Sequence, residues 1–266
     1  MLYNNFDKIV CINLKERTDK YNSIKKVSEK LNIPIEFYFA EKHSESGRIG
    51  CFESHLHVIK ECYNNGGKNI LIFEDDFIET SSYNETKIKD ILDFLRKNEW
   101  CEYFQLGYTI LPHELYKYFS SKTLTENIIQ YNGNGAHSYI LNRAGMKRII
   151  NTWENNIQTE DLDIYYKKIF LKNGASICPI LFDQNFCINN DNDPATTIYY
   201  RIMRYLSCLQ YNLSFLYLLS IIRSNPYYTF IPFFLFFLSI ILFSILWFYE
   251  KKFEKPFKKE YMKRKR

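Results

Sequence analysis

The sequence lacks the short motifs that mark several large enzyme classes. It contains no GxxxxGK[ST] phosphate loop, no GxGxxG dinucleotide fingerprint, no GxSxG nucleophile elbow and no HExxH zinc motif. No two of its seven cysteines form a CxxC pair, and their number is odd. We therefore expect buried, reduced thiols rather than a disulfide framework or a zinc site built on paired cysteines.

Net positive charge is absent from most of the chain. The 266 residues include 35 Lys plus Arg and 30 Asp plus Glu, a formal net charge of +5. The segment 250–266 holds nine of the basic and three of the acidic residues, which leaves 26 basic and 27 acidic residues in 1–249. A nucleic-acid binder concentrates basic residues on its folded part. We therefore expect no nucleic-acid partner, and we treat 250–266 as a basic tail.

A long uncharged segment precedes this tail. Residues 227–249 read YYTFIPFFLFFLSIILFSILWFY, with aromatic residues at both ends. As a helix, these 23 residues are about 34 Å long, enough to cross a hydrocarbon core of about 30 Å. Aromatic residues at both ends are typical of the membrane–water interfaces. The segment predicts a transmembrane helix and contact with membrane lipid.

Residues 196–226 form an amphipathic or weak membrane segment. Within it, 205–222 is uncharged but carries Gln210 and Asn212, so it either lies in the interface or spans the membrane. If it spans, the chain makes a hairpin, and the positive-inside rule places the N-terminal part and the tail in the cytosol. A single span would place the N-terminal part on the opposite side. No N-terminal signal-peptide pattern is visible, so we favour a membrane protein whose large domain faces the cytosol.

Residues 1–195 predict one folded domain of the α/β class. Short apolar runs alternate with segments of helical spacing, which indicates a mostly parallel central sheet flanked by helices. Ligands in such sheets bind at the carboxyl ends of the strands. The expected strands are 8–14, 35–40, 69–73, 103–106, 137–141 and 176–182, and the expected helices are 18–31, 51–63, 85–96, 143–153 and 161–171.

The strongest candidate site is Glu74-Asp75-Asp76, directly after the apolar run NILIF. Three adjacent carboxylates repel one another unless a cation or solvent offsets their charge. In an extended chain Glu74 and Asp76 point to the same side and could hold one divalent ion, while Asp75 faces a sugar or caps the backbone. The alternative is a solvated acidic turn or a helix cap.

Three further segments offer candidate residues. A helix that begins at Gly50 would direct free N–H groups toward an anion and place Ser54 and His55 in its first turns. In the segment Asn13 to Arg17, the arginine could grip a diphosphate or simply pair with Asp19.

Asp161, at the start of an expected helix, could be a catalytic base or a sugar ligand, but it could equally cap the helix. Spacing alone does not choose between it and its neighbours Glu160 and Asp163.

Taken in order, these segments resemble glycosyltransferase family 25. The segments that carry the resemblance are NLxxR (Asn13, Leu14, Arg17), GCxxSH (Gly50, Cys51, Ser54, His55), ILIFEDDF (70–77), the glycine-flanked segment 135–145, Asp161, and the Pro179 to Gln184 segment. Together they span about residues 6–193.

The resemblance implies a GT-A-like fold and an inverting transfer of galactose or glucose from a UDP-sugar to a hydroxyl of a glycan, lipid or protein acceptor. It further implies Mn²⁺ or Mg²⁺ as the metal. By position, it assigns these roles: Glu74 and Asp76 to the metal, Asp75 and Asp161 to catalysis, and Asn13, Arg17, Ser54 and His55 to donor or acceptor binding.

The chain departs from the family pattern at two positions: Lys20 replaces a second arginine, and Thr159-Glu160 stands where a proline is usual. A lysine keeps the positive charge but cannot form a bidentate fork. The alternative function is a catalytically inactive nucleotide-sugar-binding or scaffold protein at a membrane.

Overall fold

The computed structural model describes residues 2–110, 114–154, 160–184 and 223. Both predicted membrane segments (196–226 and 227–249) fall outside these residues apart from Arg223, and so does the basic tail. Among the helices in the described part, none is long and apolar enough to cross a bilayer.

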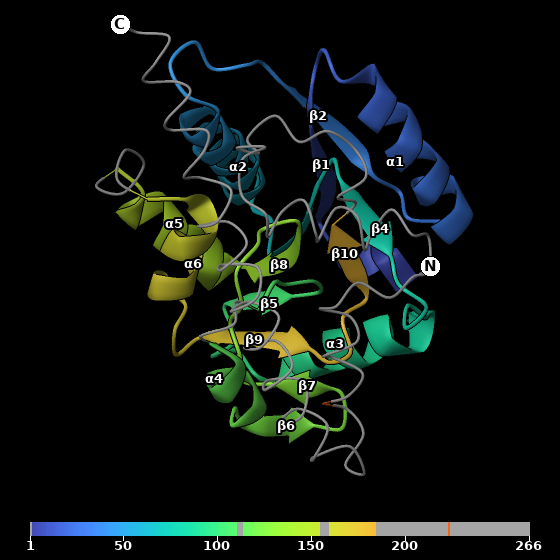
Figure 1. Ribbon diagram of the computed structural model, residues 1–266, viewed down its shortest axis with the longest axis vertical. Coiled ribbons are helices and arrows are strands. Elements are labelled where there is room, and N and C mark those ends of the chain that lie inside the picture. Colours follow the sequence, from blue (N-terminus) through green and yellow to red (C-terminus); the bar gives the residue numbers. More distant parts are fainter. Residues whose placement is uncertain (1, 111–113, 155–159, 185–222, 224–266) are drawn as a thin grey trace, which may run out of the picture. The chain divides into compact units, whose positions relative to one another are not determined.

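The domain is built on an eight-stranded sheet with the strand order β2-β1-β3-β8-β5-β9-β7-β6 (Figure 1). From the pairing directions, β8 and β7 run opposite to the six other strands. The prediction of a mixed α/β fold with a mostly parallel sheet is therefore confirmed. The strands are β1 (Lys8–Leu14), β2 (Glu36–Ala40), β3 (Asn69–Glu74), β5 (Tyr103–Gln105), β6 (Thr123–Thr125), β7 (Ile128–Ile129), β8 (Ser138–Asn142) and β9 (Gly174–Ile177).

Helices cover both faces of this sheet (Figure 1). One face packs against α1 and α3, and the other packs against α2, α5 and α6. The helices are η1 (Leu2–Asn5), α1 (Thr18–Leu31), α2 (Gly47–Asn64), α3 (Glu85–Lys97), α4 (Leu115–Phe119), α5 (Arg143–Thr152) and α6 (Leu162–Ile169). A second, two-stranded sheet pairs β4 (Phe77–Glu79) with β10 (Phe182–Gln184).

The central strands have apolar side chains on both faces because each face carries a helical layer. In β3, Leu71 and Phe73 belong to the core beneath α1 and α3, while Ile70 and Ile72 belong to the core beneath α2, α5 and α6. This alternation follows from the two-residue period of a strand. It fixes the register of β3 and therefore the place where its acidic end emerges.

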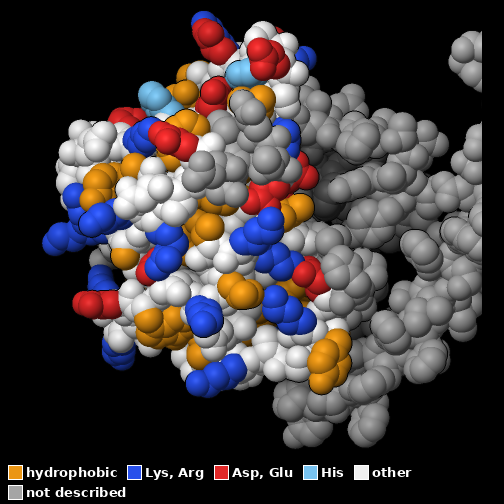
Figure 2. Space-filling view, turned by 90° about the vertical axis from the view of Figure 1, so that its left-hand side faces the viewer, with side chains coloured by type: hydrophobic (Ala, Val, Ile, Leu, Met, Phe, Trp, Pro, Cys, Tyr) orange, Lys and Arg blue, Asp and Glu red, His pale blue; other side chains and the backbone are white. Residues whose placement is uncertain are grey.

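Charged side chains of both signs lie on the face that Figure 2 shows. Acidic side chains and histidines gather toward the top of that view, and basic side chains are more frequent in its middle and lower part.

Two sequence predictions about elements are wrong. The helix expected to begin at Gly50 begins at Gly47, and the Gly50 N–H donates to the carbonyl of Ser46 at 3.1 Å. Gly50 therefore offers no free N–H to an anion. The strand expected over 176–182 is divided into β9 and β10, with the cis peptide Cys178–Pro179 between them. The two parts pair in different sheets, so β10 joins β4 next to the acidic segment.

Candidate active site

The acidic segment lies where three central strands meet. Glu74 is the last residue of β3, and it is in register with Ile12 near the end of the parallel strand β1. On its other side β3 pairs with the antiparallel strand β8, and the Glu74 N–H donates to the carbonyl of His137 at 3.0 Å. The carboxyl ends of β1 and β3 and the start of β8 therefore converge on this point.

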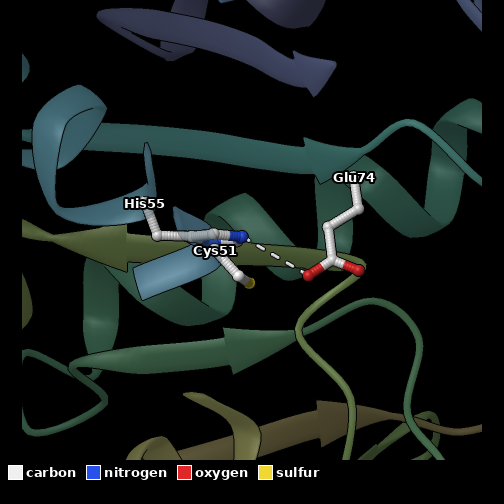
Figure 3. A group of neighbouring side chains, drawn as sticks. All are labelled: Cys51, His55 and Glu74. Carbon is white, nitrogen blue, oxygen red and sulfur yellow. Dashed lines mark ion pairs between the residues drawn. The ribbon is translucent and has the colours of Figure 1, made fainter. Parts of the chain in front are cut away.

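Glu74 is held by a histidine from α2 (Figure 3). Its Oε1 lies 3.3 Å from Nε2 of His55, which is 1 % exposed. On the opposite edge of the ring, His55 Nδ1 lies 2.7 Å from the hydroxyl of Tyr139, which in turn lies 3.2 Å from the hydroxyl of Tyr166. Burial raises the pKa of Glu74, but the hydrogen bond and charge of His55 outweigh it, so the net pKa is lowered. Glu74 is therefore kept in its carboxylate form.

Asp75 points to a different partner. Its Oδ1 accepts a hydrogen bond from Nζ of Lys20 at 2.6 Å, and both side chains are largely buried. Burial raises the pKa of Asp75, and the lysine offsets this only in part. Lys20 lies in α1, so this ion pair joins the α1 layer to the end of β3.

Asp76 has the most costly environment of the three acids. It is 6 % exposed, and its Oδ1 has no hydrogen-bond partner among the described residues. Burial, followed by the charge of Glu74, raises its pKa to about 7. A buried carboxylate oxygen without a partner destabilises the fold, which is the signature of a group kept for binding rather than for stability.

The predicted binding residues Asn13, Arg17 and Ser54 already make local contacts. Arg17 Nε and Nη2 donate to the carboxylate of Asp19, both at 2.9 Å, and this lowers the pKa of Asp19 to about 2. Ser54 Oγ donates to the carbonyl of Gly50 at 2.6 Å, within α2. Asn13 Nδ2 donates to the carbonyl of Leu14 at 2.6 Å, but its buried Oδ1 has no partner among the described residues.

The start of α6 carries the acids that the sequence could not rank. Glu160 pairs with Lys168, and Asp163 accepts the N–H of Gly135 at 3.0 Å and that of Ile164 at 2.9 Å. Asp161 is the N-cap residue, is exposed, and makes no side-chain capping bond. Of the three, Asp161 is the carboxylate that the local structure leaves most available.

Cys51 connects these acids electrostatically. After burial, the charges of Glu74, Asp163, Asp161 and Asp76 are the next largest causes that raise the pKa of its thiol. The carboxyl end of β3 and the start of α6 therefore face a common region beside the first turns of α2.

Sequence reasoning missed three residues at this point. His137 Nδ1 and Ser138 Oγ are buried and have no partner among the described residues. Burial lowers the pKa of His137, although Asp183 and Glu74 act in the opposite direction. Gly107 fits closely here, since a Cβ on it would lie 2.3 Å from His137 Nε2 and 2.0 Å from the carbonyl oxygen of Phe182. The segment 135–145 that carries the resemblance contains His137 and Ser138, but no local pattern predicts their place beside the acidic segment, because that place depends on the pairing of β8 with β3 and β5.

Comparison with known proteins finds a family model that matches the central segment. Residues 40–165 match the sequence model of glycosyltransferase family 25, described as LPS biosynthesis protein. The central segment of the chain is therefore similar to glycosyltransferase family 25. This match confirms the predicted resemblance and supports glycosyltransferase as the functional class. The matched residues include Ser54, His55, the acidic segment and Asp161, whereas Asn13 and Arg17 lie before them.

Two other comparisons add less. No curated protein matches the chain. Among solved structures, UDP-glucose pyrophosphorylase complexed with UDP-glucose is similar over 66% of this chain and 74% of that chain, with 12% sequence identity and a TM-score of 0.36. A likeness at this level carries no argument about activity.

Proposed function

We propose that the protein is a membrane-anchored, inverting glycosyltransferase that transfers galactose or glucose from a UDP-sugar to a hydroxyl of a glycan, lipid or protein acceptor. The observation that carries the proposal is the buried Asp76 carboxylate, whose Oδ1 has no partner, beside Glu74 at the carboxyl end of β3. Both residues lie within the glycosyltransferase family 25 segment. The proposed fold is GT-A-like.

The donor set fits a hard divalent cation. Glu74 and Asp76 supply carboxylate oxygens, which are the ligands that Mn²⁺ and Mg²⁺ prefer. A cation between them would also relieve the repulsion that raises the pKa of Asp76. When bound, such an ion supplies charge stabilisation for a departing diphosphate.

The remaining acids take separate roles. Asp75 positions the acidic segment through its ion pair with Lys20 and its hydrogen bond with the backbone of Leu14, and it would contact the sugar when the donor is bound. Asp161 accepts the proton of the acceptor hydroxyl, because it is exposed and makes no capping bond.

Residues at the end of β1, at the N-cap of α1 and in α2 complete the donor site. Arg17 would exchange its contact with exposed Asp19 for the donor phosphates, since a bidentate guanidinium suits either anion. Asn13, Ser54 and His55 lie around the same strand ends as donor or acceptor contacts. Anchoring through the predicted membrane segment would concentrate the enzyme beside a lipid-linked acceptor.

An assay with radiolabelled UDP-galactose and UDP-glucose tests the proposal. The full chain in detergent with Mn²⁺ should release UDP from one donor, and Asp76→Asn should slow this by about 100-fold or more, as for loss of an electrostatic stabiliser. Asp90→Asn, on the exposed face of α3, is the matched control and should leave the rate unchanged.

Absence of turnover with every UDP-sugar would contradict the enzyme assignment. If calorimetry then still detected UDP binding, the alternative of an inactive nucleotide-sugar-binding protein would replace it.

A further inference from the structure

We infer that Cys51, His55 and Glu74 form a binding site for one soft divalent transition-metal ion, with Zn²⁺ as the best match. The donor set is sulfur, nitrogen and oxygen, and it differs from the all-oxygen set that Glu74 and Asp76 offer to Mn²⁺ or Mg²⁺. Thiolate and imidazole ligands select zinc-like ions over hard cations.

The three side chains converge on one point (Figure 3). The thiol of Cys51, the ring nitrogen of His55 and the carboxylate of Glu74 each place one ligand atom within 4.8 Å of the other two. A tetrahedral zinc ion, with bonds of about 2.0–2.3 Å, holds its ligand atoms roughly 3.3–3.6 Å apart. The 3.3 Å between His55 Nε2 and Glu74 Oε1 already has this spacing. The other separations therefore need to contract by about 1.5 Å at most.

The supporting elements hold these ligands in place. Cys51 and His55 are four residues apart in α2, so their side chains lie on the same face of the helix. Glu74 comes from β3, which is paired on both edges. Two of the three ligands thus share one helix, and the third ends a central strand. The backbone positions of the three ligands are therefore restrained relative to one another.

Tyr139 acts as the outer partner that a metal-binding histidine normally has. Its hydroxyl lies 2.7 Å from Nδ1 of His55. The same hydroxyl lies 3.2 Å from the hydroxyl of Tyr166, which extends the hydrogen-bond network. In the ion-free contact Nε2 carries the proton that faces Glu74, and a metal ion would displace this proton to solvent. With Nδ1 donating to Tyr139, Nε2 would then offer its lone pair to the ion beside Glu74 and Cys51. A hydrogen bond on one ring nitrogen fixes the tautomer that frees the other nitrogen for a metal.

Accessibility and charge also favour an ion here. Cys51 is half-buried, whereas the other described cysteines, Cys11, Cys62, Cys101 and Cys178, are buried. On binding, the thiol proton leaves to solvent as the metal–sulfur bond forms, and one thiolate plus one carboxylate neutralise the divalent charge. With three protein ligands, the fourth position is left to water or another ligand, as in open zinc sites.

Cobalt(II) is the probe that tests this site, because thiolate ligation to it gives a near-ultraviolet charge-transfer band. The reduced, metal-free full chain should develop this band and saturate at one equivalent of Co²⁺, and Zn²⁺ should abolish it. Cys51→Ala should lose the band. Cys62→Ala is the matched control, since it removes a buried thiol from the same helix and should keep the band.

Tyr139→Phe provides a second, milder variant that removes only a hydroxyl group. It should keep the band but weaken Co²⁺ binding by about 10-fold to 100-fold, as for loss of an outer-shell partner. Absence of the band in the folded wild-type chain, or a band unchanged in Cys51→Ala, would overturn the inference. The titration contains no nucleotide sugar, so its outcome is independent of whether sugar transfer is observed.

Discussion

Three adjacent carboxylates are given three different environments. Glu74 faces His55, Asp75 pairs with Lys20, and Asp76 is buried with one oxygen unpartnered. The sequence places the acids together at the end of a strand, but the extended conformation expected over 74–76 is wrong. Glu74 is the last residue of β3, and Asp75 and Asp76 form the turn before β4. The identity of each partner depends on contacts between distant segments, so it could not be read from the spacing.

At the scale of single residues, the Lys20–Asp75 ion pair leads to a prediction about stability. Lys20→Ala should lower the free energy of unfolding by about 3–5 kcal/mol, because it leaves a buried carboxylate without its countercharge. Chemical denaturation at neutral pH measures this loss.

The double variant Lys20→Met with Asp75→Asn removes both charges and serves as the control. It should recover most of the lost stability. A single variant as stable as the wild type would show that the pair does not form.

Asp76 predicts a specific pH dependence of stability. Its folded-state pKa of about 7 lies above the ordinary value of an aspartate, so the folded chain retains a proton that the unfolded chain has released. Stability should therefore fall as the pH rises from about 4 to about 7, and it should change no further from this cause above that range.

Asp76→Asn removes this titration and so isolates it. In a chelating buffer, the unfolding free energy of the variant should exceed that of the wild type at pH 8 by more than it does at pH 5. These two differences should themselves differ by more than the roughly 1.4 kcal/mol that corresponds to one pKa unit. Thermal melting across this pH range measures the difference. A gain that does not vary with pH would mean that Asp76 titrates normally.

At the scale of elements, local patterns predicted the regular segments well. The helix expected over 18–31 is α1 to the residue, and the strand expected over 8–14 is β1. In both, the apolar spacing repeats without interruption and a polar residue marks the start. Such elements are fixed by their own residues and by one buried face.

Other elements depend on pairing that local patterns do not encode. The strand expected over 176–182 is divided, because its first part pairs with β5 and β7 while its last part pairs with β4. The predicted start of α2 is too late in the sequence, because residues 47–50 carry no apolar spacing. They are nevertheless helical, and Ser46 is the N-cap residue. Both differences lie beside the site, where the chain departs from regular patterns.

The N-cap of α3 makes an element-scale prediction. Asn84 accepts the N–H of Lys87 at 2.8 Å, so Asn84→Ala should lower the unfolding free energy by about 1 kcal/mol. Asn84→Asp retains a capping oxygen and should be nearly neutral. Thermal melting should show a loss of about 2–4 °C for alanine only. Equal loss in both variants would indicate that the cap is not responsible.

At the scale of the whole molecule, the site is assembled from five segments. The ends of β1 and β3, the first turns of α2, and the starts of β8 and α6 each contribute side chains to it. The sequence indicated four of these: the ends of β1 and β3 through the edge rule for parallel sheets, and the starts of α2 and α6 as expected helix starts. The start of β8 was not foreseen, because its antiparallel direction reverses which end faces the ligand.

The predicted membrane hairpin makes a prediction about sidedness. Protease added to sealed cytosol-out vesicles should digest both the N-terminal domain and the basic tail. A glycan on Asn84, which begins the sequon Asn84-Glu85-Thr86, should be absent. Protection of the N-terminal domain, or occupation of this exposed asparagine by a glycan, would place the domain on the other side of the membrane.

The central claim is that the acids at the end of β3 bind the diphosphate of a UDP-sugar through a divalent ion. A crystal structure of the full chain with UDP and Mn²⁺ tests this most directly, since anomalous scattering locates the manganese. We predict the manganese peak between Glu74 and Asp76, with the diphosphate beside it. A diphosphate bound elsewhere in the domain, with these carboxylates in their present contacts, would contradict the account.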